Sequence, residues 1–225
     1  MIDKVVNIEK AMENVNDGIT LMISGFAQGG SPRHLIKAVA DKGVKNLSTI
    51  SDDLGPTNRG FDQTIARLIS NHQISKAKCS FLGQNKEASN QYVNGDIEVE
   101  FIPMGTFAER IRAGGSGIGG FLTKTGVGTL IEEGKQTVVV DGEKYILETP
   151  LTADVALVKA YKADRFGNAI FRYNSINFNV VMAMAAKTVI LEVEHIVEIG
   201  EIEPDQVQLP GVFVDYIVVS DEEVL

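Results

Sequence analysis

The fold is decided by residues 19–51, which read ITLMISGFAQGGSPRHLIKAVADKGVKNLSTIS. The first five residues are uncharged and mostly apolar, which predicts a short buried strand. Ser31 and Pro32 are typical of a helix N-cap and a first helical residue, and we expect that helix to end near Gly43. Residues 47–51 then predict a second strand. A strand, a helix and a strand in this order indicate a parallel sheet.

The same alternation continues on both sides of this unit and predicts an α/β fold. An Asp141-Gly142 pair between two apolar runs predicts a small β-hairpin near 137–147. No linker divides the chain, so we expect a single domain over residues 1–225, an open, mostly parallel sheet with flanking helices. Further helices are expected at 5–16, 65–74, 86–93, 107–112 and 179–186, and further strands at 78–82, 97–102, 153–160, 188–193 and 212–219.

Composition excludes several classes of function. The chain has 225 residues, 44% hydrophobic and 23% charged, and a net charge of −9, which argues against non-specific nucleic-acid binding. No apolar run reaches the roughly 20 residues of a membrane helix, and no early segment resembles a signal peptide. The lone Cys79 is expected to be structural, and His34, His72 and His195 lack ligand spacing, so we expect no metal. A cytoplasmic location is the simplest expectation.

Two glycine-rich segments are the candidate ligand sites. Residues 24–30 follow a predicted strand and precede a helix, where parallel sheets bind ligands, although the spacing matches neither a Walker loop nor a dinucleotide fingerprint. A ligand role and a tight structural turn stay equally open there. Residues 109–129, ERIRAGGSGIGGFLTKTGVGT, hold seven glycines in 21 positions. We expect 113–120 to be a loop that a long ligand approaches closely, with Arg110 and Arg112 suggesting a polar group held there; a plain flexible loop is the alternative.

No candidate nucleophile accompanies these segments, which suggests that the reactive group lies on another chain. Together the motifs resemble family I CoA-transferases. Residues 17–32 resemble the first family signature, and 109–115 with 123–129 resemble the second. Residues 150–157, 164–168 and 177–179 extend the resemblance over nearly the whole chain, which looks like an A (alpha) subunit of the acetate/butyrate–acetoacetate or 3-oxoacid type.

The resemblance implies a mechanism and a division of labour. A glutamate of the B (beta) subunit would attack an acyl-CoA thioester, so no catalytic nucleophile is expected in this chain. Coenzyme A would be a substrate carrier, with no permanently bound cofactor, and the assembly would be α2β2. Acetate, butyrate, acetoacetate and succinate are all candidate acids. The implied CoA-binding residues are Ser24, Gly25, Phe26, Ala27, Gln28, Gly29 and Gly30, and the implied inter-subunit loop is Gly114, Gly115, Ser116 and Gly117.

Two positions depart from the family pattern. Ser24 replaces a glycine, with a mild expected effect. Met104 replaces the glutamine that resembles an oxyanion donor, and a thioether cannot donate a hydrogen bond. The backbone N–H of Gly105 is one expected substitute, and Gln84, Asn85 and Gln91 are others. The alternative function is a non-catalytic sensor that binds CoA or a phosphorylated ligand on the same type of sheet.

Overall fold

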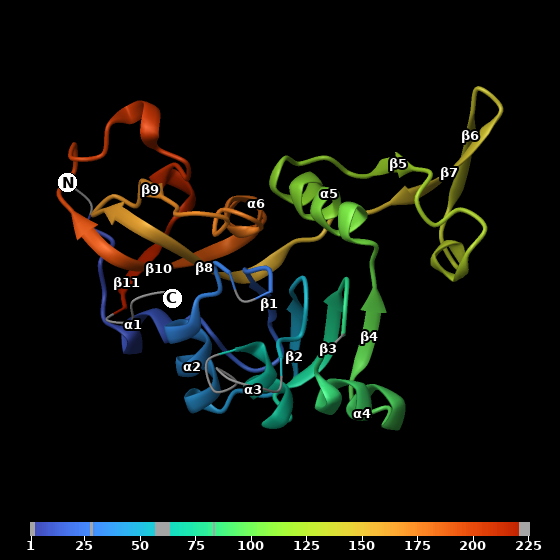
Figure 1. Cartoon of the computed structure of the whole chain (residues 1–225), viewed down its shortest axis with the longest axis horizontal. Helices are drawn as coiled ribbons and strands as arrows, with labels where there is room; N and C mark the ends of the chain where they lie inside the picture. Colours follow the sequence, from blue (N-terminus) through green and yellow to red (C-terminus); the bar gives the residue numbers. More distant parts are fainter. Residues whose placement is uncertain (1–2, 28, 57–63, 83, 221–225) are drawn as a thin grey trace.

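The main sheet is open and mostly parallel, which confirms the predicted fold class (Figure 1). The computed structural model describes residues 3–27, 29–56, 64–82 and 84–220. Its main strands follow the order β11-β10-β8-β1-β2-β3-β4 with parallel neighbours, and β9 pairs antiparallel with β8. The strands are β1 (Thr20–Ile23), β2 (Leu47–Ile50), β3 (Ile74–Cys79), β4 (Glu98–Phe101), β8 (Ala153–Asp164), β9 (Ala169–Ile170), β10 (Ala186–Val197) and β11 (Tyr216–Val219).

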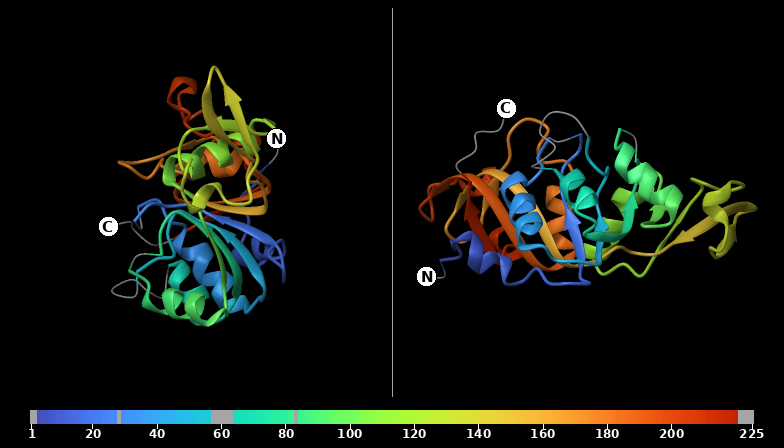
Figure 2. Two further views of the ribbon diagram at one scale, coloured as in Figure 1. Left: turned by 90° about the vertical axis from the view of Figure 1, so that its right-hand side faces the viewer. Right: turned by 90° about the horizontal axis from the view of Figure 1, so that it is seen from below.

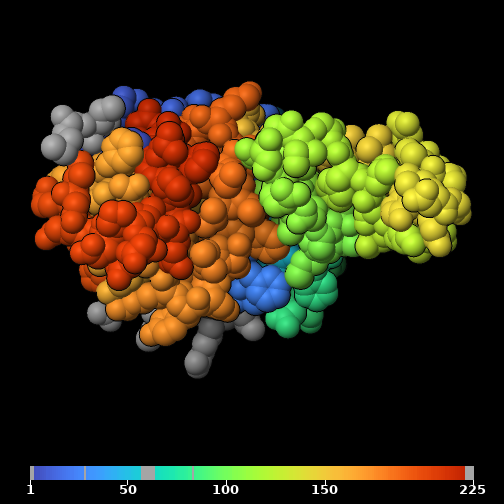
Figure 3. All heavy atoms as spheres, turned by 90° about the horizontal axis from the view of Figure 1, so that it is seen from above, coloured from blue at the N-terminus to red at the C-terminus, as the bar shows by residue number. Residues whose placement is uncertain are grey.

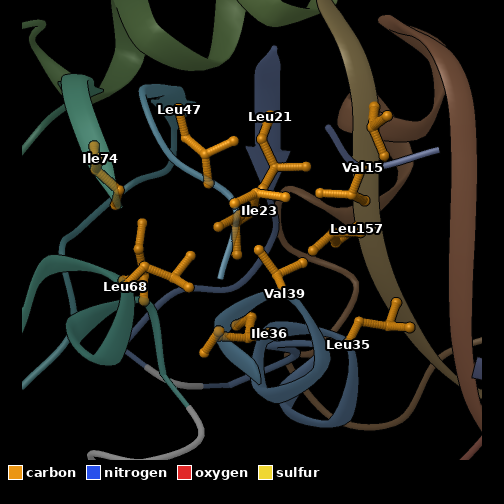
Figure 4. Close-up of a cluster of buried hydrophobic side chains, with 14 of the residues drawn as sticks. Val15, Leu21, Ile23, Leu35, Ile36, Val39, Leu47, Leu68, Ile74 and Leu157 are labelled. Carbon is orange, nitrogen blue, oxygen red and sulfur yellow. The ribbon is translucent and has the colours of Figure 1, made fainter. Parts of the chain in front are cut away.

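Helices cover both faces of this sheet and enclose two hydrophobic cores. Side chains alternate between the faces along β1, so Leu21 and Ile23 enter one core while Met22 enters the other. Figure 4 shows the first core, where Leu35, Ile36 and other apolar side chains of α2 meet the sheet. The first core is closed by α1 (Ile8–Met12), α2 (Arg33–Lys42), α3 (Ile65–Ser70) and α4 (Lys86–Asn94), and the second by α5 (Met104–Gly115) and α6 (Asn179–Met184).

A small antiparallel sheet projects from this body as an arm (Figures 2 and 3). It pairs β5 (Phe121–Thr123) with β7 (Glu143–Glu148), and β7 with β6 (Thr137–Val140). Asp141 and Gly142 both have positive φ, 52° and 80°, as a type I′ turn requires. The predicted hairpin near 137–147 is therefore confirmed.

The structure moves several predicted boundaries. The first helix is shorter than 5–16, α2 begins at Arg33 after Pro32 as the N-cap residue, and α3 ends at Ser70. The strand predicted at 78–82 begins instead at Ile74. Its outward-facing lysines pair with the neighbouring strand β4, where Lys76 Nζ lies 2.8 Å from Glu98 Oε2. The charged lysines make this segment look polar in the sequence, although the other side chains of the strand reach the core.

The single cysteine has the buried position expected of a structural residue. Cys79 is buried at the end of β3, and burial is the main cause that raises the pKa of its thiol to about 12, which makes it inert, as a structural cysteine is. Among the described residues, no helix has both the length and the apolar character needed to cross a membrane.

Candidate functional site

The carboxyl end of β1 is the topological switch point of the sheet. On one side the chain order proceeds through β2, β3 and β4, and on the other through β8, β10 and β11. Ligands of open α/β sheets bind at such a point, beyond the carboxyl ends of the strands. The first glycine-rich loop, residues 24–30, follows β1 there, as the sequence predicted. In Figure 1 the strands β3 and β4 point with their carboxyl ends toward α5.

A cleft of about 530 Å³ opens at these strand ends. It joins the tip of the first loop to the segments that follow β2, β3 and β4, so residues distant in sequence share one wall. Met104, the first residue of α5, lies in this wall and is 44% exposed. The lining residues are Phe26, Ala27, Asp52, Asp53, Gly55, Pro56, Ser80, Phe81, Leu82, Gln84 and Met104.

Hydrogen bonds within the chain hold the first loop. The backbone N–H groups of Phe26 and Gly29 donate to each other's carbonyl oxygens, at 3.0 and 2.9 Å, and Ser24 N donates to Leu157 O. Ala27 N donates to Asp53 Oδ2 at 3.2 Å. These four amide groups therefore already have acceptors within the protein. Gln28 lies outside the described residues.

Gly30 of this loop is required by its close packing against Ser175 and Asn179, at and just before the start of α6. A Cβ on Gly30, whose φ is +71°, would lie 2.5 Å from Ser175 O. Asn179 Nδ2 donates to Gly30 O and to Ser175 O, while its Oδ1 accepts from Lys159 N. The buried Asn179 thus ties the loop to both α6 and β8. Ser24, which replaces a family glycine, is accommodated because its hydroxyl donates to Gly30 O at 3.2 Å.

The structure separates the three side chains considered as substitutes for the family glutamine at position 104. Asn85 is buried at the start of α4, where it donates to Leu54 O and accepts from Ala88 N. Gln91 is also buried, and its Nε2 donates to Ile69 O and Glu87 Oε1. Both are structural. Gln84 alone of the three lines the cleft with Met104. Gly105 stands in the first turn of α5, where backbone N–H groups have no acceptor within the helix.

Two adjacent carboxylates after β2 are functional candidates that the sequence analysis missed. Asp53 is held by the backbone, since its oxygens accept from Ala27 N and from Gly55 N at 3.2 and 2.8 Å. Asp52 is 3% exposed, and its Oδ1 has no hydrogen-bond partner among the described residues. Burial, and then the charge of Asp53, raise the pKa of Asp52 to about 6. The sequence did contain a signal for this site, since two aspartates directly after a buried strand lie at the edge of a parallel sheet where ligands bind.

Asp52→Asn should stabilise the protein at neutral pH. The raised pKa means that the folded state binds this proton more tightly than the unfolded state, so the free energy of unfolding falls as pH rises from about 4 to about 6. Full burial would give 1.36 kcal/mol per pKa unit, and screening from the open cleft reduces this, so we expect a gain of about 1–2 kcal/mol at pH 7. Urea unfolding at pH 4 and pH 7 measures it. Equal differences at the two pH values would contradict the assignment.

The second glycine-rich segment differs from the expected loop. Gly114 and Gly115 belong to the last turn of α5, Ser116 caps it, and Gly117 follows with φ +69°. A helix of this length places Gly115 about 16 Å from Met104 along its axis. The segment is therefore at the opposite end of α5 from the cleft, and α6 links it to the first loop, with Asn179 against Gly30 and Met184 against Gly115.

The two arginines of this segment make contacts within the chain. Arg110 is buried, and it donates to Thr149 O at 2.7 Å and to Glu100 Oε1 at 2.6 Å. Arg112 is exposed and pairs with Glu109 one turn away. We expected these arginines to help hold a polar group. Both do contact polar groups, but the groups belong to this same chain.

Comparison with known proteins gives the family. The model of the family described as "Coenzyme A transferase" matches residues 5–220. The chain is 46% identical over 218 residues to the acetoacetyl-CoA:acetate/butyrate CoA transferase alpha subunit of Clostridium acetobutylicum, covering 97% of this chain and 98% of that one. It is 40% identical to the acetate CoA-transferase alpha subunit of Escherichia coli K12, covering 99% of each. The A subunit of a probable succinyl-CoA:3-ketoacid coenzyme A transferase of Bacillus subtilis is 46% identical, covering 96% and 90%.

Solved structures share the fold. An acyl-CoA transferase of Escherichia coli O157:H7 superposes with a TM-score of 0.89 at 24% identity over 99% of this chain, which spans 48% of that chain. Glutaconate coenzyme A-transferase of Acidaminococcus fermentans gives a TM-score of 0.81 at 18% identity, covering 96% and 75%. The relatives confirm the CoA-transferase prediction rather than the alternative of a non-catalytic sensor. This chain, with its cleft at the switch point of a parallel sheet, belongs to the coenzyme A transferase family.

Proposed function

We propose that this chain is the alpha subunit of a CoA-transferase that moves CoA between a short-chain acyl-CoA and a carboxylic acid, and that its cleft forms the acyl side of an active site shared with a beta subunit. The observation that carries the proposal is that Met104, at the family's oxyanion position, lies in one cleft with the Phe26–Ala27 tip of the first glycine-rich loop. The alpha subunit of the Clostridium relative is named for acetoacetyl-CoA, acetate and butyrate, which supports short-chain substrates.

The chemistry of the cleft supports a nucleophile supplied from outside this chain. No glutamate is among the described residues that line it. Both oxygens of Asp53 already accept backbone hydrogen bonds, and Asp52 is too buried to approach a thioester carbonyl. We therefore assign the attack to a glutamate of the beta subunit. Its carboxylate adds to the thioester carbonyl, the C–S bond breaks, and CoA leaves as the thiolate while an acyl–glutamyl anhydride forms.

The remaining steps return the enzyme to its starting state. The CoA thiolate attacks the glutamyl carbonyl of the anhydride, which releases the first acid and leaves a glutamyl–CoA thioester. A second carboxylate then attacks the carbonyl of that thioester, the C–S bond breaks, and a new acyl–glutamyl anhydride and CoA thiolate form. The thiolate attacks the acyl carbonyl of this anhydride, which gives the new acyl-CoA and releases the glutamate carboxylate. In each step negative charge develops on a carbonyl oxygen. We assign the stabilisation of this charge to the N-terminal turn of α5, and the backbone N–H of Gly105 in that turn is the candidate donor.

Reconstitution tests the proposal. The purified chain is mixed with a beta subunit from the same source, and formation of acetyl-CoA from acetoacetyl-CoA and acetate is followed. We expect transfer by the mixture, none by either chain alone, and a mass by light scattering that equals two alpha and two beta chains. Transfer by this chain alone would contradict the division of labour, and a mixture that forms a complex without transfer would contradict the function.

Met104→Gln should raise the rate without disturbing the fold. The side chain is 44% exposed in the first turn of α5, so an amide there stays solvated. Restoring a side-chain donor beside the Gly105 N–H should increase kcat/KM for acetoacetyl-CoA by about tenfold, less than the effect of removing a sole oxyanion donor. Steady-state kinetics of the alpha–beta complex measures this. Leu130→Gln, an exposed change on the arm, is the control, and an unchanged rate in Met104→Gln would remove position 104 from the oxyanion site.

A further inference from the structure

The described residues that line the cleft carry charge of one sign only. Asp52 and Asp53 are its only charged groups among the described lining residues, and no lysine, arginine or histidine is among those residues. The rest of this wall is apolar or neutral, with Phe26, Phe81 and Leu82 among its apolar members. A bound molecule therefore meets negative charge and hydrocarbon on this side.

The two aspartates differ in how well the protein compensates them. Asp53 accepts two backbone hydrogen bonds, whereas Asp52 has an oxygen without a partner among the described residues and is almost completely buried. Because the pKa of Asp52 is about 6, its carboxyl group is mostly ionised at neutral pH. A charge that is largely withdrawn from water is screened less than a fully exposed one, so it acts more strongly on groups placed near it. Asp52 is thus the main source of repulsion toward an anion in the cleft.

We propose that this wall makes the enzyme selective for acids with one carboxylate and an uncharged far end, and that Asp52 excludes dicarboxylic acids. The inference rests on the proposed function, because the reacting carboxyl must lie toward Met104 and Gly105 for CoA transfer. The rest of the acid then extends along the aspartate wall. A second carboxylate there would lose water and gain no cation from the described residues of this wall, so its complex is disfavoured. The curated relatives include subunits named for acetate/butyrate and for succinyl-CoA, so their names alone leave the class open.

An isosteric pair of acceptors tests the selectivity. Levulinate carries a methyl ketone where succinate carries its second carboxylate, and the two acids are similar in length. With acetoacetyl-CoA as donor and the alpha–beta complex as enzyme at pH 7.5, we expect kcat/KM for levulinate to exceed that for succinate by about tenfold or more. Asp52→Asn should lower this ratio by about tenfold, because the repulsive charge is gone while the size of the side chain is kept.

Asp141→Asn is the matched control. It removes the same charge at the turn of the arm, where Asp141 has φ 52° and asparagine is well tolerated, and the ratio should stay as in the wild type. Equal use of the two acids by the wild type would overturn the inference, and so would an unchanged ratio in a folded Asp52→Asn complex. If that variant fails to assemble, the wild-type comparison and Asp52→Ser decide the matter. A complex that transfers CoA to no acid overturns the proposed function itself, whereas equal transfer to both acids overturns only the selectivity.

Discussion

Gly114→Ala will lower the free energy of unfolding by about 3 kcal/mol or more, at the upper end of what overpacking costs. A Cβ at this position would lie 2.1 Å from Leu151 O and 3.0 Å from Leu151 C. These are backbone atoms where the chain enters β8, and they cannot rotate away as a side chain would. The last turn of α5 must therefore shift away from the sheet. For a domain of this size the loss corresponds to a melting temperature lower by roughly 6–12 °C.

Gly119→Ala is the control from the same glycine-rich segment. An added Cβ there meets nothing within 4 Å, and the backbone does not need positive φ. We expect a change within about 0.5 kcal/mol, as for ordinary surface substitutions. Thermal and urea unfolding of both variants gives the comparison. Similar stability of the two variants would mean that the glycines of this segment do not serve close packing, and that the loop interpretation from the sequence should be restored.

Arg110→Met will lower the free energy of unfolding by about 3–5 kcal/mol, because it breaks a buried charge network while leaving the carboxylates in place. The side chain of Arg110 is 6% exposed and that of Glu148 is 1% exposed, with Nε and Oε2 3.7 Å apart. The guanidinium also donates to Glu100 and to Thr149 O, and so connects β4 and α5 to the segment that follows the arm. Lys135 still pairs with Glu148 in the variant, which places the expected loss near the lower value.

The pH dependence of this loss follows from Glu100. Although burial raises it, the hydrogen bonds and charges of Arg110 and Lys78 hold the pKa of Glu100 below its usual value of 4.5. The stability that Glu100 contributes is therefore present above pH 4.5 and is lost as pH falls through the lower folded-state pKa. Wild type and Arg110→Met should consequently become more alike in acid.

Arg112→Met is the matched control on the same helix. Arg112 is half exposed and pairs one turn back with Glu109, a surface interaction of about 0.5 kcal/mol or less. Urea unfolding at pH 7 and at pH 4 compares the three proteins. A loss in Arg110→Met no larger than that in Arg112→Met would show that the buried network contributes little to stability.

Local sequence determined the elements whose signals lie within a few neighbouring residues. The uncharged run of β1, the Asp141-Gly142 turn and the strand–helix–strand order through β2 each predict their structure, because strand burial, positive φ and right-handed crossover are local requirements. The family motifs likewise identified the CoA-transferase family, because they combine residue types at fixed spacing along the chain.

Other elements required contacts between distant segments. The start of β3 was missed because Lys76 and Lys78 make the strand look polar, and only the pairing with Glu98 and Glu100 on β4 accounts for them. The glycines at 114 and 115 were predicted to lie in a loop because glycine has a low helix propensity, which is a local property of the sequence. Their role is set by Leu151 and Met184, which no local pattern contains.

The sequence by itself determined an open parallel sheet, the antiparallel hairpin and the family, since hydrophobic periodicity, turn chemistry and motif spacing are all written along the chain. Only the tertiary structure decided that Met104, Gln84 and Asp52 share one cleft with the tip of the first loop, and that Arg110 has its partners inside the chain. The physical reason is that parallel strands bring their carboxyl ends to one edge whatever their separation in sequence, so the burial and charge of a residue there depend on neighbours from other strands.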